Sequence, residues 1–228
     1  MIAPLPWPEI HTVLLDMDGT LLDLRFDNHF WRELVPERYA ERHGLSLAQA
    51  HAEVKARTQA IEGTLNWYCL DYWTQDLALD IVALKREIEH LITVHPYVRQ
   101  FLDALRAASK RVVLVTNAHQ DSLALKMEKT RLTGYFDAMV CAHDLGLVKE
   151  QLEFWPRLRT VEPFDPATTL LVDDNPTILR TAQEYGITYL VSVLRPDSAD
   201  PPRIPEGFPA IQDFSELLPV VCEPARRK

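Results

Sequence analysis

An α/β fold with a parallel sheet is predicted by two features of this 228-residue sequence. Short apolar runs bounded by turn residues, which are typical of buried parallel strands, alternate with segments of helical periodicity. A long stretch at residues 24–93 interrupts this alternation and carries helical patterns without any strand pattern. Together they predict a doubly wound, Rossmann-like parallel sheet with an inserted all-helical cap domain. The core is expected at 1–23 and 94–228, and the cap at 24–93.

Five strands are predicted from apolar, β-branched runs. The strongest three lie at 12–16, 111–117 and 168–175, and each ends in polar residues. An Asp-Gly turn follows the first run. A short apolar run that is bounded by such a turn is typical of a parallel strand that is buried on both faces. Two weaker strands are predicted at 138–141 and 188–191.

Helical patterns separate these strands. They cover 97–108, 120–130 and 149–160, and Pro156 is expected to kink the third helix or to end it early. A fourth helix begins at an Asn-Pro pair, an N-cap followed by proline at the first helical position, and ends at Gly186.

About four helices are expected in the inserted stretch. A capping box at 46–49 begins one of them, and another carries an apolar stripe over 65–77. A third has apolar residues at helical spacing over 80–92. Beyond the last strand, a proline-rich surface loop is expected at 195–207 and a closing helix at 214–221.

Composition and charge restrict the possible functions. The formal net charge of −9 disfavours binding to nucleic-acid phosphates, and no run is long enough to span a membrane. The three cysteines, Cys69, Cys141 and Cys222, form neither a zinc pattern nor a disulfide framework. The N-terminus lacks the basic and apolar regions of a signal peptide. We therefore expect a reduced, cytoplasmic protein with a small-molecule partner, and the sequence does not predict its oligomeric state.

Polar side chains follow three predicted strands at the point where each strand ends. In an open parallel sheet, ligands bind beyond the carboxyl ends of the strands, where the strand order reverses. Four carboxylates in one small site need a cation to ionise together, and hard oxygen ligands suit Mg²⁺. A lysine at the start of a predicted helix could point into the same crevice. The converging residues are Asp16, Asp18, Thr116, Asn117, Lys149, Asp173 and Asp174.

These residues resemble the four motifs of the haloacid dehalogenase-like superfamily. The segment 16–20, Asp-Met-Asp-Gly-Thr, matches the first motif, and Thr116 matches the second. Lys149 matches the third motif and the pair 173–174 matches the fourth. Each later motif is weak alone, whereas the four in this order form a specific signal.

The resemblance implies a phosphoryl-transfer role for each motif. Asp16 would be the nucleophile that forms an aspartyl-phosphate, and Asp18 the general acid and base. Thr116 and Lys149 would hold the phosphoryl oxygens. Apart from the resemblance, Asn117 is expected to cap the turn that follows it, with its amide near the phosphate. Mg²⁺ would be held by Asp16, the backbone carbonyl of Asp18, Asp174 and Asp173, of which Asp173 could instead only orient its neighbour.

A closer resemblance, to the purine nucleotidase branch that dephosphorylates GMP and IMP, is carried by the segments 14–31, 34–37 and 64–73. It implies that the cap selects the base. A carboxylate or amide oxygen would accept the N1–H of guanine or hypoxanthine, which adenine lacks. Trp67 and Asp71, four residues apart, are expected to share one helix face. The candidates are Asp71 as the acceptor, Asn66 and Asn28 behind it, and Trp67 as a stacking surface.

Other functions stay open at this point. A phosphatase for small sugar or glycolate phosphates would use the same core residues. A haloacid dehalogenase would leave Asp18 and the pair 173–174 unexplained, because its chemistry needs neither a proton donor nor Mg²⁺. A binding module would be expected to have a broken set of acids. A mutase is not excluded by the sequence. His29 and His119 are expected to be incidental to catalysis.

Overall fold

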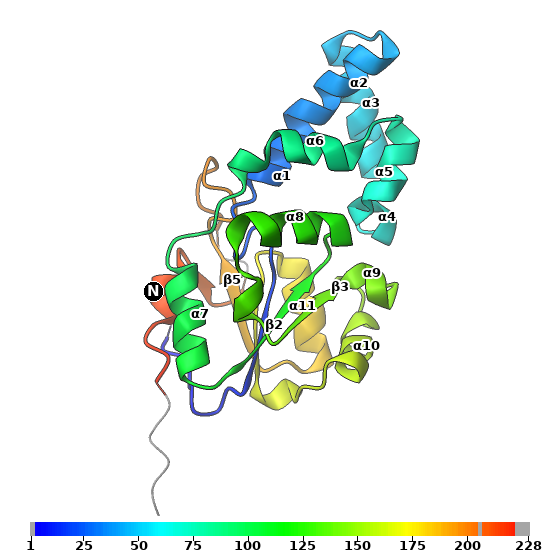
Figure 1. The fold of residues 1–228 in the computed structure, drawn as a ribbon. Coiled ribbons are helices and arrows are strands. Elements are labelled where there is room, and N and C mark those ends of the chain that lie inside the picture. Colours follow the sequence, from blue (N-terminus) through cyan, green and yellow to red (C-terminus); the bar gives the residue numbers. More distant parts are fainter. Residues whose placement is uncertain (1–2, 205–206, 222–228) are drawn as a thin grey trace, which may run out of the picture.

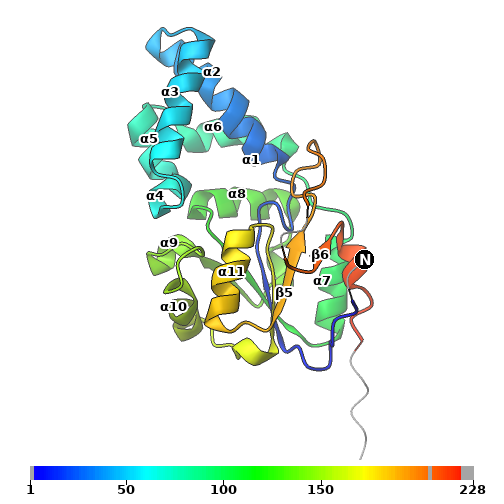
Figure 2. The same cartoon turned by 180° about the vertical axis from the view of Figure 1, so that it is seen from behind.

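The computed structural model describes residues 3–204 and 207–221, and its centre is a six-stranded parallel sheet in the order β3-β2-β1-β4-β5-β6 (Figures 1 and 2). All five predicted strands are present. The sixth, β6, was not predicted, because two residues are too short to show a periodic pattern. The strands are β1 Thr12–Leu15, β2 Arg111–Thr116, β3 Ala138–Cys141, β4 Thr169–Val172, β5 Tyr189–Val193 and β6 Ala210–Ile211.

The register of the central strands decides where the functional side chains emerge. Leu15, the last residue of β1, lies beside Leu114 on one side and Val172 on the other. Strands β2 and β3 extend the sheet on one side of β1, and β4 to β6 on the other. The strand order therefore reverses between β1 and β4, and ligands bind outside the carboxyl ends at such a point.

Helices cover both faces of the sheet, because successive side chains of a strand point to opposite faces. Helices α7 (Val98–Ala107) and α8 (Gln120–Thr130) pack on the face that carries Val13 and Leu15. Helices α10 (Phe154–Val161) and α11 (Pro176–Tyr185) pack on the face that carries Leu14. The predicted α/β fold class is thereby confirmed. No helix in the described ranges is both long and apolar enough to cross a membrane.

Residues 24–93 form a group of helices over the carboxyl edge of the sheet (Figure 1), and we call this segment the cap. No strand lies within it, as predicted, and all of its residues are described. Its apolar side chains join the core cluster of the α7 face. Its status as a separate domain stays a prediction. The elements are α1 Arg25–His29, the π-helical η1 Phe30–Leu34, α2 Val35–His43, α3 Leu47–Ala60, α4 Leu65–Tyr68, α5 Leu70–Leu77, α6 Ile81–Glu87 and the 3₁₀-helical η2 Glu89–Leu91.

Local signals at helix ends were predicted correctly. The capping box is present, since the Ser46 side chain accepts from the Gln49 N–H and the Gln49 side chain accepts from the Ser46 N–H. The Asn175 side chain caps α11, and Gly186 ends it with a left-handed φ of 106°. Such short-range signals depend on few neighbours, so the sequence carries them well.

Longer helices were predicted wrongly in the cap. The expected helix over 65–77 breaks at Cys69, whose φ and ψ of −83° and 114° are extended. The break leaves the Trp67 carbonyl free to accept the indole N–H of the buried Trp73 at 2.9 Å. Trp67 and Asp71 therefore lie on two separate helices and do not share one helix face. The helix expected over 80–92 ends at Glu87, and η2 follows it.

Two predictions outside the cap are also corrected. The helix expected from Lys149 begins at Phe154, so Lys149 lies in the preceding turn. Pro156 falls in the first turn of this helix, where N–H groups have no intrahelical partner and the ring is tolerated. The closing helix is a single 3₁₀ turn, η5 (Phe214–Leu217).

Candidate active site

Three carboxylates meet at the switch point of the sheet. Asp16 directly follows β1, and Asp173 and Asp174 directly follow β4. Because Leu15 lies beside Val172, Asp16 and Asp173 leave the sheet at the same level. One oxygen from each of the three carboxylates lies within 4.8 Å of the others. The predicted convergence of these acids is present in the structure.

A tight turn after β1 brings the first motif against the fourth. Gly19 has a left-handed φ of 82°, and the Thr20 hydroxyl accepts the N–H of Asp174 at 3.1 Å. A Cβ added at Gly19 would lie 2.8 Å from Cγ of Asp174. The turn therefore needs glycine both for its backbone conformation and for the close approach of Asp174.

Gly19→Ala should therefore displace Asp174 and lower hydrolytic activity, beside a loss of about 1–2 kcal/mol from the left-handed backbone. Gly44→Ala is the matched control, because Gly44 has a φ of 65° and nothing within 4 Å of an added Cβ. Urea denaturation and turnover would be measured for both variants. Equal activity of the two variants would contradict a role for the close approach at Gly19.

The Lys149 ammonium lies among these acids and is buried. Its Nζ donates to Asp16 at 2.5 Å, to Asp173 at 2.7 Å and to the Val115 carbonyl at 3.1 Å. Burial alone would lower the pKa of Lys149, but the charges of Asp16 and Asp173 outweigh it and raise the pKa. Lys149 is therefore a fixed positive charge at the base of the site.

The acids of the fourth motif resist ionisation in this setting. Burial and the charge of Asp16 raise the pKa of Asp174 to about 7, although the Arg203 guanidinium lies 3.1 Å away. Burial is also the largest cause of the strongly raised pKa of Asp173. A divalent cation would relieve this repulsion, and carboxylate oxygens are the ligands that Mg²⁺ prefers. The donor set of Asp16, Asp173 and Asp174 fits such an ion.

The second motif lies on the wall of the same site. The Thr116 hydroxyl accepts the N–H of Ala118 at 3.0 Å, which orients its proton away from that bond. The Asn117 side chain accepts the N–H of Lys149 at 3.0 Å and donates to Glu150 at 2.8 Å. Asn117 thus ties the third motif to the second, in addition to bordering the cavity.

Asp18 faces a lysine that the sequence analysis missed. Lys126 of α8 lies 2.6 Å from Asp18 and 2.6 Å from Asp27, and Lys85 lies 2.8 Å from Asp27. Burial raises the pKa of Asp18 to about 6, against the lowering effect of Lys126. Lys126 lies on the buried face of α8 with Leu123 and Thr130. A lysine at helical spacing among apolar residues is the sequence feature that could have indicated this buried charge.

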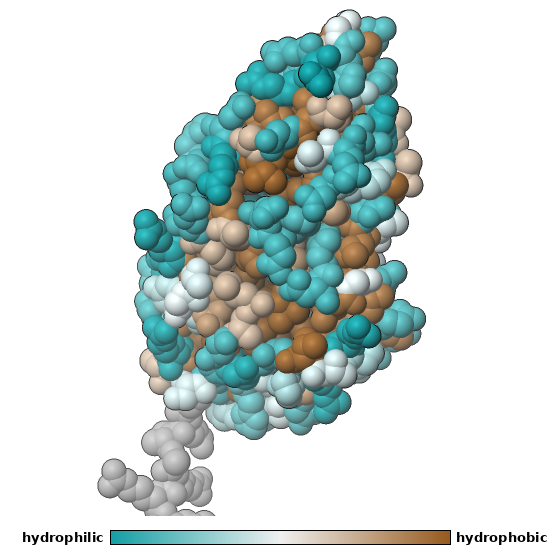
Figure 3. Space-filling view, turned by 45° about the vertical axis from the view of Figure 1, so that its right-hand side comes forward, coloured by the Kyte–Doolittle hydropathy of each residue, from teal (hydrophilic) through white to brown (hydrophobic). Residues whose placement is uncertain are grey.

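One cavity of about 1020 Å³ connects the acids with the cap. Its core part is lined by the motif residues, and its cap part by aromatic and basic side chains. Figure 3 shows apolar residues exposed among hydrophilic ones in the upper, cap part of the molecule. The cap residues that contribute rings and cations are Trp31, Trp67, Tyr68, Trp73, Arg32, His51, Lys55 and Lys85.

Of the four residues that are expected to recognise a base, two line the cavity and two do not. Trp67 and Asn28 line the cavity, and Asn28 donates to Asp197 at 2.5 Å. Asn66 and Asp71 are not among its lining residues within the described chain.

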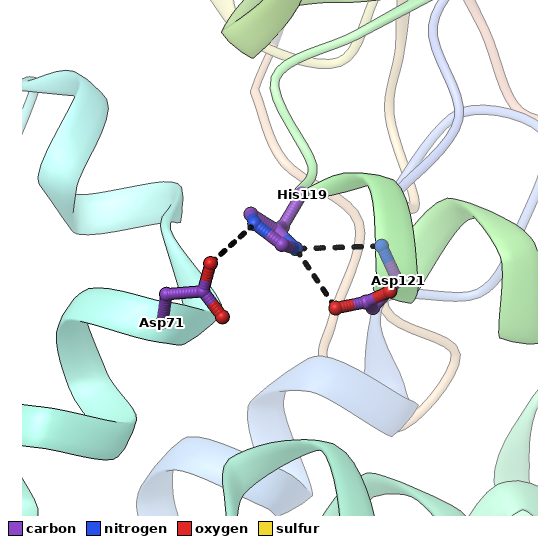
Figure 4. Close-up of side chains that lie close together, drawn as sticks. All are labelled: Asp71, His119 and Asp121. Carbon is purple, nitrogen blue, oxygen red and sulfur yellow. Dashed lines mark hydrogen bonds and ion pairs between the residues drawn. The ribbon is translucent and has the colours of Figure 1, made fainter.

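Asp71 lies at the edge of the cap and faces the core. Its carboxylate is 3.7 Å from His119, which is 3.5 Å from Asp121 at the start of α8 (Figure 4). The Asp71 side chain is 73% exposed. The three residues form a surface contact between α5 and α8, and His119 also borders the cavity.

Glu150 was also missed, although it directly follows the third motif. It accepts from Asn117 and from the hydroxyl of Tyr68 at 2.7 Å, and Tyr68 belongs to the cap. Burial and Glu150 raise the pKa of Tyr68, so its hydroxyl keeps its proton and donates. No sequence pattern pairs residues 82 positions apart, and only the fold brings them together.

Comparison with known proteins identifies the class. A family model described as haloacid dehalogenase-like hydrolase matches residues 10–186, which include the motif residues at the ends of β1, β2 and β4. The chain therefore belongs to the haloacid dehalogenase-like hydrolases, and the predicted membership is confirmed.

Particular relatives narrow this class. The chain is 38% identical over 213 residues to the GMP/IMP nucleotidase YrfG of Escherichia coli, covering 93% of this chain and 96% of that protein. The same values hold for GMP/IMP nucleotidase YrfG of Shigella flexneri. The predicted resemblance to the purine nucleotidase branch is confirmed. Family and relatives together support the predicted enzyme class, a phosphoric monoester hydrolase.

Solved structures agree on the fold. A haloacid dehalogenase-type phosphatase from Thermococcus onnurineus has a TM-score of 0.76 at 21% identity, over 91% of this chain and 96% of that one. An L-2-haloacid dehalogenase from Xanthobacter autotrophicus has a TM-score of 0.56 at 18% identity, over 82% and 78%. Because phosphatases and dehalogenases share this fold, the fold alone does not select the reaction.

Proposed function

We propose that this chain is a Mg²⁺-dependent phosphatase that hydrolyses the purine nucleoside 5′-monophosphates GMP and IMP. The observation that carries the proposal is the 38% identity to a GMP/IMP nucleotidase, which extends over 93% of the chain and so includes the cap. The proposal includes the reduced, cytoplasmic setting that the sequence leads us to expect.

The reaction proceeds in two steps on the chain's own carboxylates. Asp16 forms a bond to phosphorus while the bond from phosphorus to the 5′-oxygen breaks, and that oxygen takes the proton of Asp18. Water then attacks the phosphorus of the aspartyl-phosphate, gives a proton to Asp18 and expels the Asp16 carboxylate. Both acids return to their starting states and inorganic phosphate leaves. The raised pKa of Asp18, about 6, suits a group that both donates and accepts a proton.

The remaining motif residues hold the phosphoryl group. The hydroxyl of Thr116 binds a phosphoryl oxygen, and Lys149 binds another by exchanging one of its three present acceptors for it. The Asn117 amide lies next to Thr116 in the chain and is a third candidate. Mg²⁺ would be held by Asp16, Asp174, the backbone carbonyl of Asp18 and, directly or through orientation, Asp173. When bound, this ion stabilises the negative charge on the transferring group.

The cavity that joins the acids to the cap supports recognition of a nucleoside. Its volume of about 1020 Å³ is large for a glycolate or sugar phosphate, and rings border its cap part. Trp67 is the proposed stacking surface, and Asn28 lies on the same cavity wall. Asp71 and Asn66 stay candidates that would reach the base at the edge between cap and core.

The test of this proposal is phosphate release from GMP and IMP beside glucose 6-phosphate and phosphoglycolate, together with halide release from chloroacetate. We expect kcat/KM to be highest for the two nucleotides and halide release to be absent. A preference for phosphoglycolate or a sugar phosphate would contradict the nucleotidase assignment and retain only the assignment as a phosphatase. Halide release without phosphatase activity would assign dehalogenase chemistry instead.

Asp18→Asn should lower the rate of the first step most for substrates with poor leaving groups. A ribose alkoxide needs a proton on departure and nitrophenolate does not, and general acid catalysis contributes roughly 10²–10⁴-fold. The burst rate with GMP should therefore fall much more than the burst rate with p-nitrophenyl phosphate. Rapid-quench kinetics isolates this first step from water attack. Equal losses with both substrates would contradict the acid role.

Variants of the cap should change the choice of base. Asp71 is exposed in this structure, so its candidacy requires that the bound nucleotide bury it. An acceptor that is buried in this way and left unpaired opposite N1 of adenine costs about 1–3 kcal/mol, so IMP should be preferred to AMP roughly 5- to 150-fold. Asp71→Ala should narrow this ratio. Trp67→Ala should weaken all nucleotides and spare p-nitrophenyl phosphate. If kcat/KM for IMP and AMP keeps its ratio in Asp71→Ala, the base is recognised by other cap residues.

A further inference from the structure

A buried chain of ion pairs connects Asp18 with the cap. Lys126 Nζ lies 2.6 Å from Oδ1 of Asp18 and 2.6 Å from Oδ2 of Asp27, and Lys85 Nζ lies 2.8 Å from Oδ1 of Asp27. The two lysine side chains are 2% and 3% exposed, and the carboxylates of Asp18 and Asp27 are 21% and 18% exposed. This series of ion pairs ends at Asp18, the residue that is proposed to give a proton to the leaving oxygen.

The charges of this group balance. Two ammonium groups face two carboxylates, so each buried ion is compensated by at least one partner. Phe26 and Phe30 add ring contacts, since Lys126 Nζ lies 5.2 Å from the Phe26 ring centre and Lys85 Nζ 4.6 Å from that of Phe30. Lys126 is thus held in place by a carboxylate on each side and by a ring.

The chemistry of the ammonium group distinguishes the two oxygens of Asp18. An ammonium is only a donor, so Oδ1, which it contacts, accepts a hydrogen bond from it. Oδ1 of Asp18 accepts from Lys126 both as a carboxylate and as the carbonyl oxygen of a carboxylic acid. Because the carbonyl oxygen of a carboxylic acid is a better acceptor than its hydroxyl oxygen, this contact favours the proton on Oδ2. Lys126 itself is not among the cavity-lining residues of the described chain, whereas Asp18 is.

Lys126 belongs to the core, and its other partners belong to the cap. Asp27 is on α1 and Lys85 is on α6, whereas Lys126 is on α8. In both ribbon views α8 lies between the cap helices and the sheet, and α6 contacts α8 (Figures 1 and 2). The contact with Asp27 therefore links the position of Lys126 to α1 of the cap.

We propose that Lys126 is a positioning residue that presents Oδ2 of Asp18 to the leaving oxygen, and that Asp27 of the cap holds Lys126 in the position that this requires. This rests on the proposed function, because it needs Asp18 as the acid. It adds that the cap takes part in proton delivery as well as in the choice of substrate. Without the lysine, the carboxyl group of Asp18 can rotate and carry its proton on either oxygen.

The test compares Lys126→Met, which keeps the length of the side chain and removes its charge, with Lys126→Arg and with Lys129→Met. Lys129 is the matched control, since it lies on the same helix and pairs with Glu89 at the surface. The burst rates with GMP and with p-nitrophenyl phosphate are measured for each. We expect a loss of roughly 10- to 100-fold with GMP for Lys126→Met, which is less than the full contribution of roughly 10²–10⁴-fold from general acid catalysis because Asp18 itself is kept. The loss with p-nitrophenyl phosphate should be several times smaller, Lys126→Arg should recover part of the GMP rate, and Lys129→Met should behave as wild type.

A second variant covers the case in which Lys126→Met does not fold. The double variant Asp27→Asn/Lys85→Gln removes one charge of each sign and should show the same selective loss with GMP. Equal losses with both substrates, or no loss, in the folded variants would overturn the proposal. Asp18→Asn is measured in parallel: if it is selective and the Lys126 variants are not, this inference fails alone. If neither is selective, the acid role in the proposed function fails as well.

Discussion

Asp16→Asn should lower turnover of every phosphate monoester by roughly 10³-fold or more, the scale seen when a nucleophile is removed from an enzyme. An amide oxygen is a poor nucleophile and cannot give the acyl-phosphate. The substitution also removes a negative charge 2.5 Å from the Lys149 ammonium, which keeps Asp173 as its other partner. Steady-state kinetics with GMP and with p-nitrophenyl phosphate measures the effect.

The same loss should occur with both substrates, in contrast to Asp18→Asn, because the nucleophile is needed whatever the leaving group. Asp103→Asn is the matched control, since Asp103 is exposed on α7 of the core. Thermal unfolding shows whether the variants stay folded. Substantial activity in a folded Asp16→Asn variant would exclude Asp16 as the nucleophile.

Chelation of divalent cations should abolish turnover of wild-type enzyme. Burial and mutual repulsion disfavour ionisation of the acids around Asp16, as the raised pKa of Asp174, about 7, indicates. A bound cation favours their ionised form and neutralises the trianionic transition state. EDTA should therefore remove activity, and Mg²⁺ in excess should restore it.

Binding of the cation has a readout that is independent of activity. At about 100 times its Kd, Mg²⁺ should stabilise the folded state by roughly 2.7 kcal/mol, which raises the Tm. Asp174→Asn should reduce this increase, whereas Asp103→Asn should keep it. Turnover that persists in EDTA, or a Tm shift that is unchanged in Asp174→Asn, would contradict the assignment of the metal site.

The sheet and the core of the site could be predicted from the sequence because both depend on short segments. A fully buried strand is a continuous apolar run, so the change from Leu15 to Asp16 marks its end. The parallel register then places the residues at the carboxyl ends of β1, β2 and β4 together. Local sequence and one topological rule were therefore sufficient to predict that Asp16, Thr116 and Asp173 lie at one edge of the sheet.

The supporting contacts could not be predicted, because they depend on long-range packing. Lys126 reaches Asp18 across 108 positions of the chain, and Arg203 reaches Asp174 across 29. The break at Cys69 was missed for the same reason, since it depends on how Trp73 is buried and where its indole N–H finds an acceptor. Helical periodicity alone favoured a continuous helix there.

The most direct test of the central claim is to locate the phosphoryl group during turnover. Wild-type enzyme would be mixed with GMP labelled in its phosphate, quenched in acid within one turnover and digested, and the labelled peptide identified. We expect the label on the peptide that contains Asp16, released by hydroxylamine as an acyl-phosphate is, and absent from Asp16→Asn. Label on a different residue, or phosphate release during the first turnover without any labelled protein, would contradict the account.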